Sequence, residues 1–123
     1  MKILIINASP KHKGGASRFF SKLLKFMLAG CSVTTCDISK PSEYENVLSL
    51  LDQIDAVVIS SPLYVDGIPS HMLPFLIKAE EKCRENKCKF KLYLLSNSGF
   101  VEGKQNCLNL RMYEAWCRRA GIE

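Results

Sequence analysis

Short runs of aliphatic and β-branched residues recur along the chain and alternate with segments whose apolar residues have helical spacing. The runs are residues 2–6, 32–37, 56–60 and 90–95. The first, third and fourth are continuously apolar, which is typical of strands covered on both faces. The second, "SVTTCD", is polar enough to lie at a sheet edge. We therefore expect four strands, with the second at an edge.

Helical spacing predicts a helix after each of the first two strands. The first helix, 17–29, ends before Gly30, and we expect its apolar residues to form its core-facing side. Those residues are Phe19, Phe20, Leu23, Leu24, Met27 and Leu28. The second helix begins with a capping box formed by Ser42 and Glu45.

Two further helices follow the third and fourth strands. One covers about 70–86, with Pro74 in its first turn, where backbone donors have no helical partner. The other covers about 105–120, and its spacing predicts that Leu108, Met112, Ala115 and Trp116 are buried. Strand and helix therefore alternate four times, which predicts one α/β domain over 1–123 with a parallel sheet between two helix layers.

Composition narrows the class of protein. With 123 residues and 47% hydrophobic content, the chain is long enough for one packed core. The N-terminus lacks the apolar length of a signal peptide or a membrane span, so we expect a cytoplasmic protein that does not bind membranes. The six cysteines match no common zinc spacing, and we expect reduced structural thiols and no metal site. The net charge of +5 is spread along the chain, which argues against nucleic-acid binding but favours anionic small molecules.

Three unusual loops follow the carboxyl ends of the first, third and fourth strands, where ligands bind in open parallel sheets. The first, "NASPKHKGGAS", combines two glycines, Lys11 and two serines just before a helix N-terminus. Those features are typical of a phosphate cradle, although a plain glycine-rich turn with exposed lysines has the same composition. The loop is neither a Walker loop nor a dinucleotide fingerprint.

The second and third loops carry apolar and aromatic residues. "SSPLYVDGIPSH" contains a rigid apolar segment around Tyr64, which a flat heteroaromatic ligand would explain. The alternative is that Leu63 and Tyr64 pack beneath the third helix. "SNSGFVEGKQN" offers small side chains, free amides and the aromatic ring of Phe100.

These segments together resemble the flavodoxin-like NAD(P)H-dependent FMN reductase family. The resemblance rests on "KILIINASPKHKGGAS", "DAVVISSPLYVDGIPSHMLPFL" and "LYLLSNSGFVEGKQN" and spans nearly the whole chain. It implies a sheet of order 2-1-3-4-5, FMN bound at the three loops, and a homodimer or higher homo-oligomer. It also implies hydride transfer from NADH or NADPH through FMN to a small acceptor such as a quinone or free flavin.

The same resemblance implies which residues contact FMN. The phosphate would lie against Ser9, Lys11, Ala16 and Ser17. The flavin ring would lie against Pro62, Leu63, Tyr64 and Val65, with Ser96, Asn97, Ser98, Gly99 and Phe100 along its other edge. Ala16 departs from the family, which commonly has Asn there, so one side-chain contact to the phosphate is lost.

A larger departure lies at the C-terminus. The family continues with a fifth strand and usually a fifth helix, whereas this sequence ends at Glu123 after the fourth helix. The expected sheet order is therefore 2-1-3-4, with a bare fourth strand whose edge a partner chain, a loop or domain swapping would cover.

Hydride transfer to a flavin needs orientation more than acid–base catalysis, so we expect no catalytic side chain. Accordingly, His12 and His71 are isolated in the sequence, and capping or exposed roles are expected for both. A flavodoxin-type electron carrier and an inactive folded fragment remain alternative interpretations. A phosphoacceptor domain is disfavoured, because Asn7 and Ser60 occupy the positions where it would need acids.

Overall fold

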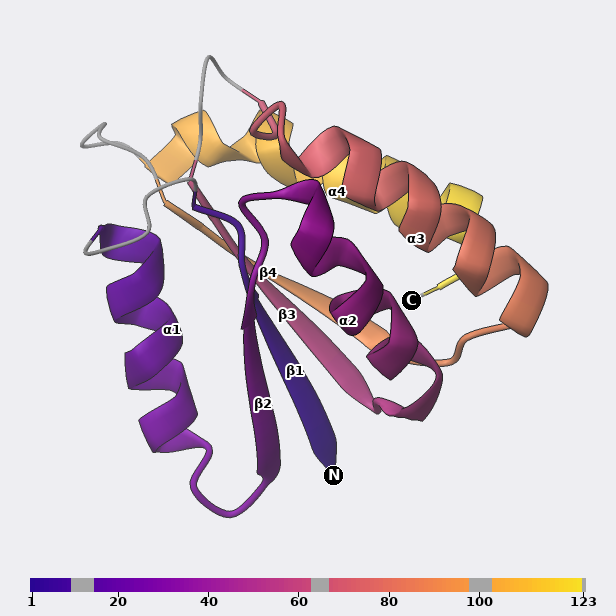
Figure 1. The fold of residues 1–123 in the computed structure, drawn as a ribbon. Helices are drawn as coiled ribbons and strands as arrows, with labels where there is room; N and C mark the ends of the chain where they lie inside the picture. Colours follow the sequence, from indigo (N-terminus) through magenta and orange to yellow (C-terminus); the bar gives the residue numbers. More distant parts are fainter. Residues whose placement is uncertain (10–14, 63–66, 98–102, 123) are drawn as a thin grey trace.

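The computed structural model describes residues 1–9, 15–62, 67–97 and 103–122, and within them four parallel strands form one twisted sheet (Figure 1). The strands are β1 (Lys2–Asn7), β2 (Ser32–Asp37), β3 (Ala56–Pro62) and β4 (Lys91–Asn97). Their order is β2-β1-β3-β4, as predicted, and all three pairings are parallel. Each predicted strand is present, and β1, β3 and β4 extend one or two residues further toward their carboxyl ends than expected.

Four α-helices connect and follow the strands. They are α1 (Ala16–Met27), α2 (Tyr44–Leu50), α3 (Met72–Asn86) and α4 (Cys107–Ala120). Short 3-10 turns precede α2 and α4 and follow α2, at Pro41–Glu43, Gly103–Asn106 and Leu51–Gln53 respectively.

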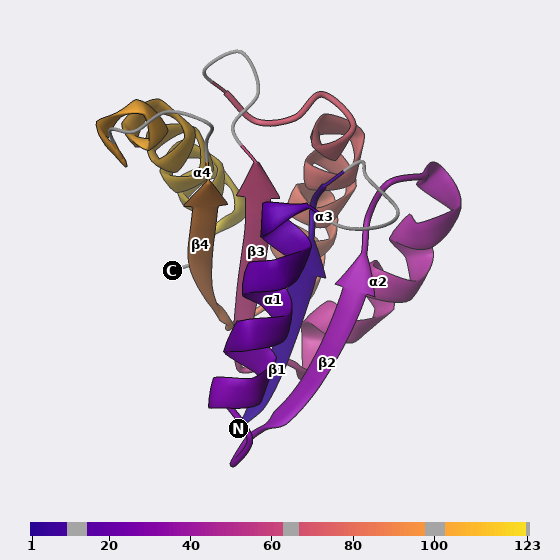
Figure 2. The ribbon, with the colours of Figure 1, turned by 90° about the vertical axis from the view of Figure 1, so that its left-hand side faces the viewer.

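The helices form two layers of unequal size around the sheet. α2, α3 and α4 cover one face, whereas α1 lies against the other (Figures 1 and 2). This three-layer arrangement is the flavodoxin-like α/β/α fold that the sequence predicts. Its second helix layer consists of one helix in the part of the chain that the structure describes.

Strand alternation divides the buried residues between the two faces. Leu4, Ile6, Val57 and Ile59 point toward α2, α3 and α4 and belong to the large core. Their neighbours Ile3, Ile5, Ala56 and Val58 form a much smaller cluster on the α1 side.

Two sequence-based expectations about helix faces are wrong. On α4 the buried residues are Asn109, Tyr113 and Ala120, while Leu108 and Met112 are exposed. Ala115 is also exposed, and Trp116 is half-buried, with its indole N–H donating to the Leu76 carbonyl at 2.9 Å. The apolar pattern missed this face because it begins with Asn109, a polar residue.

On α1 the sheet-facing positions are Ser17 and Ser21, with Leu24 and Leu28 half-buried further along the helix. Four of the six apolar residues expected in the core are exposed instead. They are Phe19, Phe20, Leu23 and Met27.

The predicted capping box of Ser42 and Glu45 is also replaced by another contact. The Glu43 carboxylate accepts hydrogen bonds from the backbone amides of Ser39 and Lys40, at 2.6 and 3.1 Å. The capping box therefore joins Lys40 and Glu43, two residues earlier in the chain than the motif predicts.

All six cysteines are free thiols. Burial raises the pKa of Cys83 to about 12, so this thiol is inert at neutral pH. Among the described residues, no helix has the length and apolar character to cross a membrane.

Candidate functional site

The candidate site lies at the carboxyl ends of β1, β3 and β4, next to the start of α1. The chain leaves β1 toward α1 on one face and leaves β3 toward α3 on the other face (Figure 2). This divergence between neighbouring strands is the topological switch point, where ligands bind in open α/β sheets.

Ser17, in the first turn of α1, links this helix to two strand ends. Its hydroxyl donates to Asn97 Oδ1 at 2.7 Å, across 80 residues of sequence. Its backbone carbonyl accepts hydrogen bonds from the hydroxyls of Ser60 and Ser21, both at 2.8 Å. Since Ser17 is only 2% exposed, these contacts hold the helix start against the ends of β3 and β4.

The N-terminus of α1 has the properties of an anion site. Gly15 precedes it with φ of 90°, a conformation that favours glycine, and among the described residues no side chain caps the helix. No acidic residue lies in the first turn. The first amides of a helix have no intrahelical acceptor, so those of α1 present donors and a partial positive charge.

Charged and polar residues at the end of β2 support this helix start. Arg18 pairs with Asp37 at 3.2 Å, and the Asp37 carboxylate also accepts from Asn7 Nδ2 at 2.9 Å. Asn7 Oδ1 in turn accepts a long hydrogen bond of 3.4 Å from the backbone amide of Ser9. The predicted phosphate residue Ser9 is therefore held by the polar ends of two adjacent strands.

The opposite side of the site is a buried polar layer beneath β3 and β4. Ser96 donates its hydroxyl hydrogen to Asn106 Oδ1 at 3.0 Å and accepts from Asn109 Nδ2 at 2.8 Å. Tyr113 donates to the Ser61 hydroxyl at 3.5 Å, and burial raises the pKa of Tyr113 to about 12. Because Ser96 uses its hydroxyl toward α4, that hydroxyl has a supporting role in this structure.

The predicted site residues fall into two groups. Ser9, Ala16, Ser17, Pro62, Ser96 and Asn97 are described and gather at this end of the sheet. Lys11, Leu63, Tyr64, Val65, Ser98, Gly99 and Phe100 lie outside the described residues.

Sequence reasoning missed several residues that support the site. His71 Nε2 lies 2.7 Å from the Ala8 carbonyl oxygen, while the Tyr44 hydroxyl donates to the His71 carbonyl at 2.9 Å. His71 thus joins the start of α3 to the residue that follows β1, and the capping or exposed role expected for it is wrong, because its half-buried side chain makes no cap hydrogen bond to α3. The pairing of Asn7 with Asp37 had a signal in the sequence, since a polar residue ends each of two adjacent strands.

Within the described ranges, no group of histidine, cysteine and acidic side chains is arranged to hold a metal ion. The hydrogen-bonding groups around the start of α1 and the ends of β3 and β4 are backbone amides, serine hydroxyls and asparagine side chains. Such groups bind and orient a polar or anionic ligand by hydrogen bonding.

Neither a scan of protein-family models nor a search of curated proteins finds a significant match to the chain. Solved structures do match it. One is a flavodoxin, WrbA-like protein from Agrobacterium tumefaciens, with a TM-score of 0.72 and 16% identity over 98% of this chain and 74% of that chain. Another is an NADPH-quinone reductase from P. pentosaceus, with a TM-score of 0.77 and 20% identity over 99% of this chain and 80% of that chain.

A third similar structure is an NADH:FMN oxidoreductase in its apo form, with a TM-score of 0.74 and 11% identity over 99% of this chain and 70% of that chain. At these identities the likeness concerns the fold. The chain has the flavodoxin-like fold over almost its whole length.

Proposed function

We propose that this chain is an FMN-dependent oxidoreductase of the NAD(P)H-dependent FMN reductase type. It passes hydride from NADH or NADPH through FMN to a small acceptor such as a quinone or free flavin. The observation that carries the proposal is the hydrogen bond between Ser17 and Asn97, which joins the loop expected to bind phosphate to the loop expected to border the flavin.

The donor set at the start of α1 fits a phosphate group. Uncapped helix amides and the absence of an acidic residue in the first turn favour a dianionic ligand. The loss of a side-chain contact at Ala16 leaves these backbone amides as the main donors, and Lys11 adds a positive charge. Ser17 contributes its backbone amide, because its hydroxyl is engaged with Asn97.

FMN, when bound, supplies a flavin ring that accepts a hydride and releases it to an acceptor. The chain's own part is to orient that ring. Buried Pro62 at the end of β3 and Asn97 at the end of β4 flank the place where the ring would lie. Their strands are paired in register there, which keeps the two sides of the site at a constant separation.

An electron carrier of the flavodoxin type is the alternative, since one of the similar structures is named a flavodoxin. The two functions differ in turnover. A reductase oxidises NADH or NADPH continuously when a quinone is supplied, whereas a carrier does not.

The proposal is tested by titrating the purified protein with FMN and with riboflavin, followed by flavin fluorescence. We expect FMN to bind more tightly, because riboflavin lacks the phosphate. Lys11→Ala should weaken FMN by about 1.5 to 3 kcal/mol, the range of a charge-assisted hydrogen bond, and leave riboflavin unchanged. Lys25→Ala is the matched control, because it removes the same charge from the last turn of α1, at the end of the helix away from the proposed phosphate site.

Equal affinities for FMN and riboflavin would contradict a phosphate site at this loop. Steady oxidation of NADPH or NADH with a quinone acceptor would support the reductase function. Tight FMN binding without such turnover would favour the electron carrier instead.

A further inference from the structure

The peptide group between Ala8 and Ser9 lies at the start of the loop that is expected to bind phosphate. Both residues are buried, and Ala8 is the first residue after β1. The backbone amide of Ala8 donates to the Ser60 carbonyl of β3 at 2.8 Å, so β3 fixes the chain just before this peptide group. The direction in which the loop leaves the sheet therefore depends on how the Ala8–Ser9 peptide group is turned.

Both polar atoms of this peptide group have a partner. Its carbonyl oxygen, on Ala8, lies 2.7 Å from His71 Nε2. Its N–H, on Ser9, donates to Asn7 Oδ1 at 3.4 Å. A carbonyl oxygen can only accept, so Nε2 of His71 carries the hydrogen of the shorter bond. Because the contact with Asn7 is long, the imidazole of His71 is the stronger of the two restraints.

His71 is itself held by the large core on the α3 side of the sheet. The Tyr44 hydroxyl donates to the His71 backbone carbonyl at 2.9 Å, and the Tyr44 ring packs against Phe75 with ring centroids 5.7 Å apart. Both rings are buried in the large core. The backbone amide of Met72 donates to the Pro69 carbonyl at 2.9 Å, which closes a turn around His71. The backbone that carries the imidazole is therefore fixed.

His71 also connects two of the three loops at the candidate site. It is the last residue before α3, at the end of the segment that follows β3 and is expected to border the flavin ring. Its imidazole reaches the start of the loop expected to hold the phosphate, 63 residues earlier in the chain. The hydrogen bond of His71 thus links these two loops from the α3 side, whereas the bond between Ser17 and Asn97 links α1 to β4.

We propose that His71 is a positioning residue of the phosphate site. Its imidazole N–H holds the Ala8–Ser9 peptide group in the orientation that directs the following loop toward the phosphate of FMN, so the inference rests on the proposed function. The two polar groups of His71 have separate tasks. The imidazole orients the phosphate loop, while the backbone carbonyl, bound to Tyr44, fixes the end of the segment expected to border the ring. Loss of the imidazole should therefore affect phosphate binding and spare the ring.

The alternative is a structural contact that only docks α3 on the sheet. Two observations favour the positioning role. Phe75, Leu76 and Ala79 already bury one side of α3 in the large core, whereas the imidazole of His71 is only half-buried. The hydrogen bond of His71 also ends beyond the strand, on the peptide group that leads into the loop, rather than on β1 itself.

The test compares the affinities of the full chain for FMN and riboflavin by flavin fluorescence, because the two ligands differ only in the phosphate. His71→Ala should weaken FMN about 10-fold, near the upper end of what one neutral hydrogen bond contributes, and leave riboflavin within about twofold. His71→Gln keeps a side-chain N–H that can reach the Ala8 carbonyl, so it should recover most of the FMN affinity. His71→Leu, which fills similar space without a donor, repeats the test if the alanine variant unfolds.

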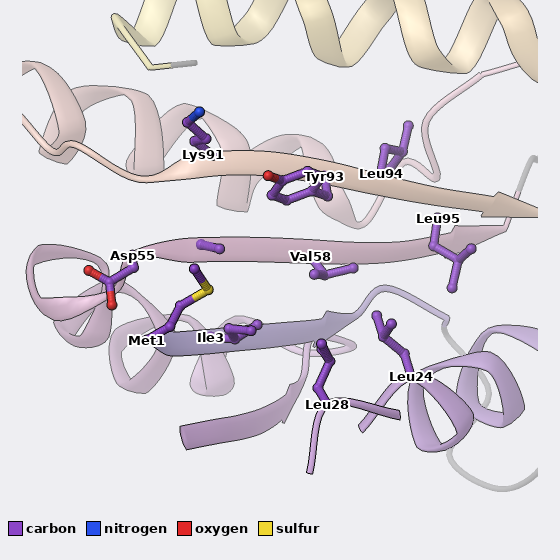
Figure 3. A pocket seen from close by; sticks show the side chains of 11 residues that line it. Met1, Ile3, Leu24, Leu28, Asp55, Val58, Lys91, Tyr93, Leu94 and Leu95 are labelled. Carbon is purple, nitrogen blue, oxygen red and sulfur yellow. The ribbon is translucent and has the colours of Figure 1, made fainter. Parts of the chain in front are cut away.

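Two control variants separate positioning from a general loss of stability. Trp116→Phe removes the same kind of bond from the same helix, because the Trp116 ring N–H donates to the Leu76 carbonyl of α3 at 2.9 Å. Leu28→Ala removes packing at the far end of α1. Figure 3 shows Leu28 pointing toward the sheet in an apolar cavity of about 440 Å³, which borders the small core on the face away from α3. Both variants should lower the melting temperature and leave the ratio of FMN to riboflavin affinity unchanged.

A second measurement needs no flavin. Inorganic phosphate is titrated into the protein without flavin, and the backbone amide signal of Ser17, in the first turn of α1, is followed by NMR. His71→Ala should weaken phosphate binding, and His71→Gln should restore it. Hydrogen exchange of the Ser9 amide should be faster in His71→Ala, because this amide belongs to the peptide group that the imidazole no longer holds.

An unchanged ratio of FMN to riboflavin affinity in His71→Ala would overturn the proposal, whether both affinities stay the same or fall equally. A control variant that lowers the ratio as much as His71→Ala would also overturn it. If the unmodified chain binds neither flavin, the proposed function fails, and the phosphate titration then decides the role of His71. Weaker phosphate binding in His71→Ala than in the unmodified chain and His71→Gln would support the positioning role, and equal phosphate binding in all three would overturn it.

Discussion

Ser17 and Asn97 are hydrogen-bonded at 2.7 Å, although 80 residues separate them in the sequence. Ser17 lies in the first turn of α1, and Asn97 is the last residue of β4. This contact closes one side of the candidate site, because each residue adjoins a loop expected to bind the cofactor. Its disruption should affect the site more than the fold.

Replacing Ser17 by alanine should lower the free energy of unfolding by about 1 to 2 kcal/mol, since Asn97 Oδ1 loses a buried donor. FMN affinity should fall with it. Ser21→Ala is the control: Ser21 is equally buried, but its hydroxyl bonds within its own helix. Urea unfolding, followed by Trp116 fluorescence, measures the free energy of unfolding of both variants. If Ser17→Ala and Ser21→Ala weaken FMN binding equally, the hydrogen bond from Ser17 to β4 does not organise the site.

Replacing Tyr64 by alanine should weaken FMN by about 1 to 3 kcal/mol, the scale of aromatic stacking together with lost burial. Unfolding should stay cooperative. Tyr64→Phe keeps the ring and should bind FMN almost as well as the unmodified protein. Unchanged flavin affinity with a large fall in melting temperature would instead make Tyr64 a core residue.

Glu43 should make stability depend on pH. Burial acts to raise the pKa of Glu43, but hydrogen bonds from the amides of Ser39 and Lys40 outweigh it and the pKa is lowered. A lowered carboxyl pKa stabilises the fold above the unfolded-state pKa, and this contribution is lost as the pH falls through the folded-state pKa. Glu43→Gln should therefore lose about 0.5 to 1.5 kcal/mol at pH 7, the range for a weakened hydrogen bond.

Once the pH has fallen below both the unfolded-state pKa and the lowered folded-state pKa of Glu43, Glu43→Gln and the unmodified chain should unfold at similar denaturant concentrations. Glu45→Gln is the control, because Glu45 makes an exposed ion pair with Lys78 at 3.8 Å, a contact that contributes little to stability. If Glu43→Gln lowers the free energy of unfolding equally at low pH, the negative charge of Glu43 does not stabilise the fold.

The sequence by itself determined the order of elements and the sheet. Continuous apolar runs such as Ile3 to Ile6 are stable only when both faces are covered, and strand–helix alternation leaves parallel crossovers as the topology. The positions of Ser9, Pro62 and Asn97 at one end of the sheet follow from that topology alone. The local pattern is enough to identify these strands, because a strand that is buried on both faces has apolar residues at every position of its own sequence.

Tertiary structure decided which side of each helix is buried and which polar groups meet. Ser17 and Ser21 of α1 and Asn109 of α4 face inward because hydroxyls and amides on neighbouring elements receive them, and no single-helix pattern contains those partners. Phe19 and Phe26 of α1 are exposed for a different reason: the apolar residues of this helix extend beyond the side that faces the sheet. The periodicity of the sequence shows which residues of a helix are apolar, whereas only the packing of the helix on the sheet shows which of them are buried.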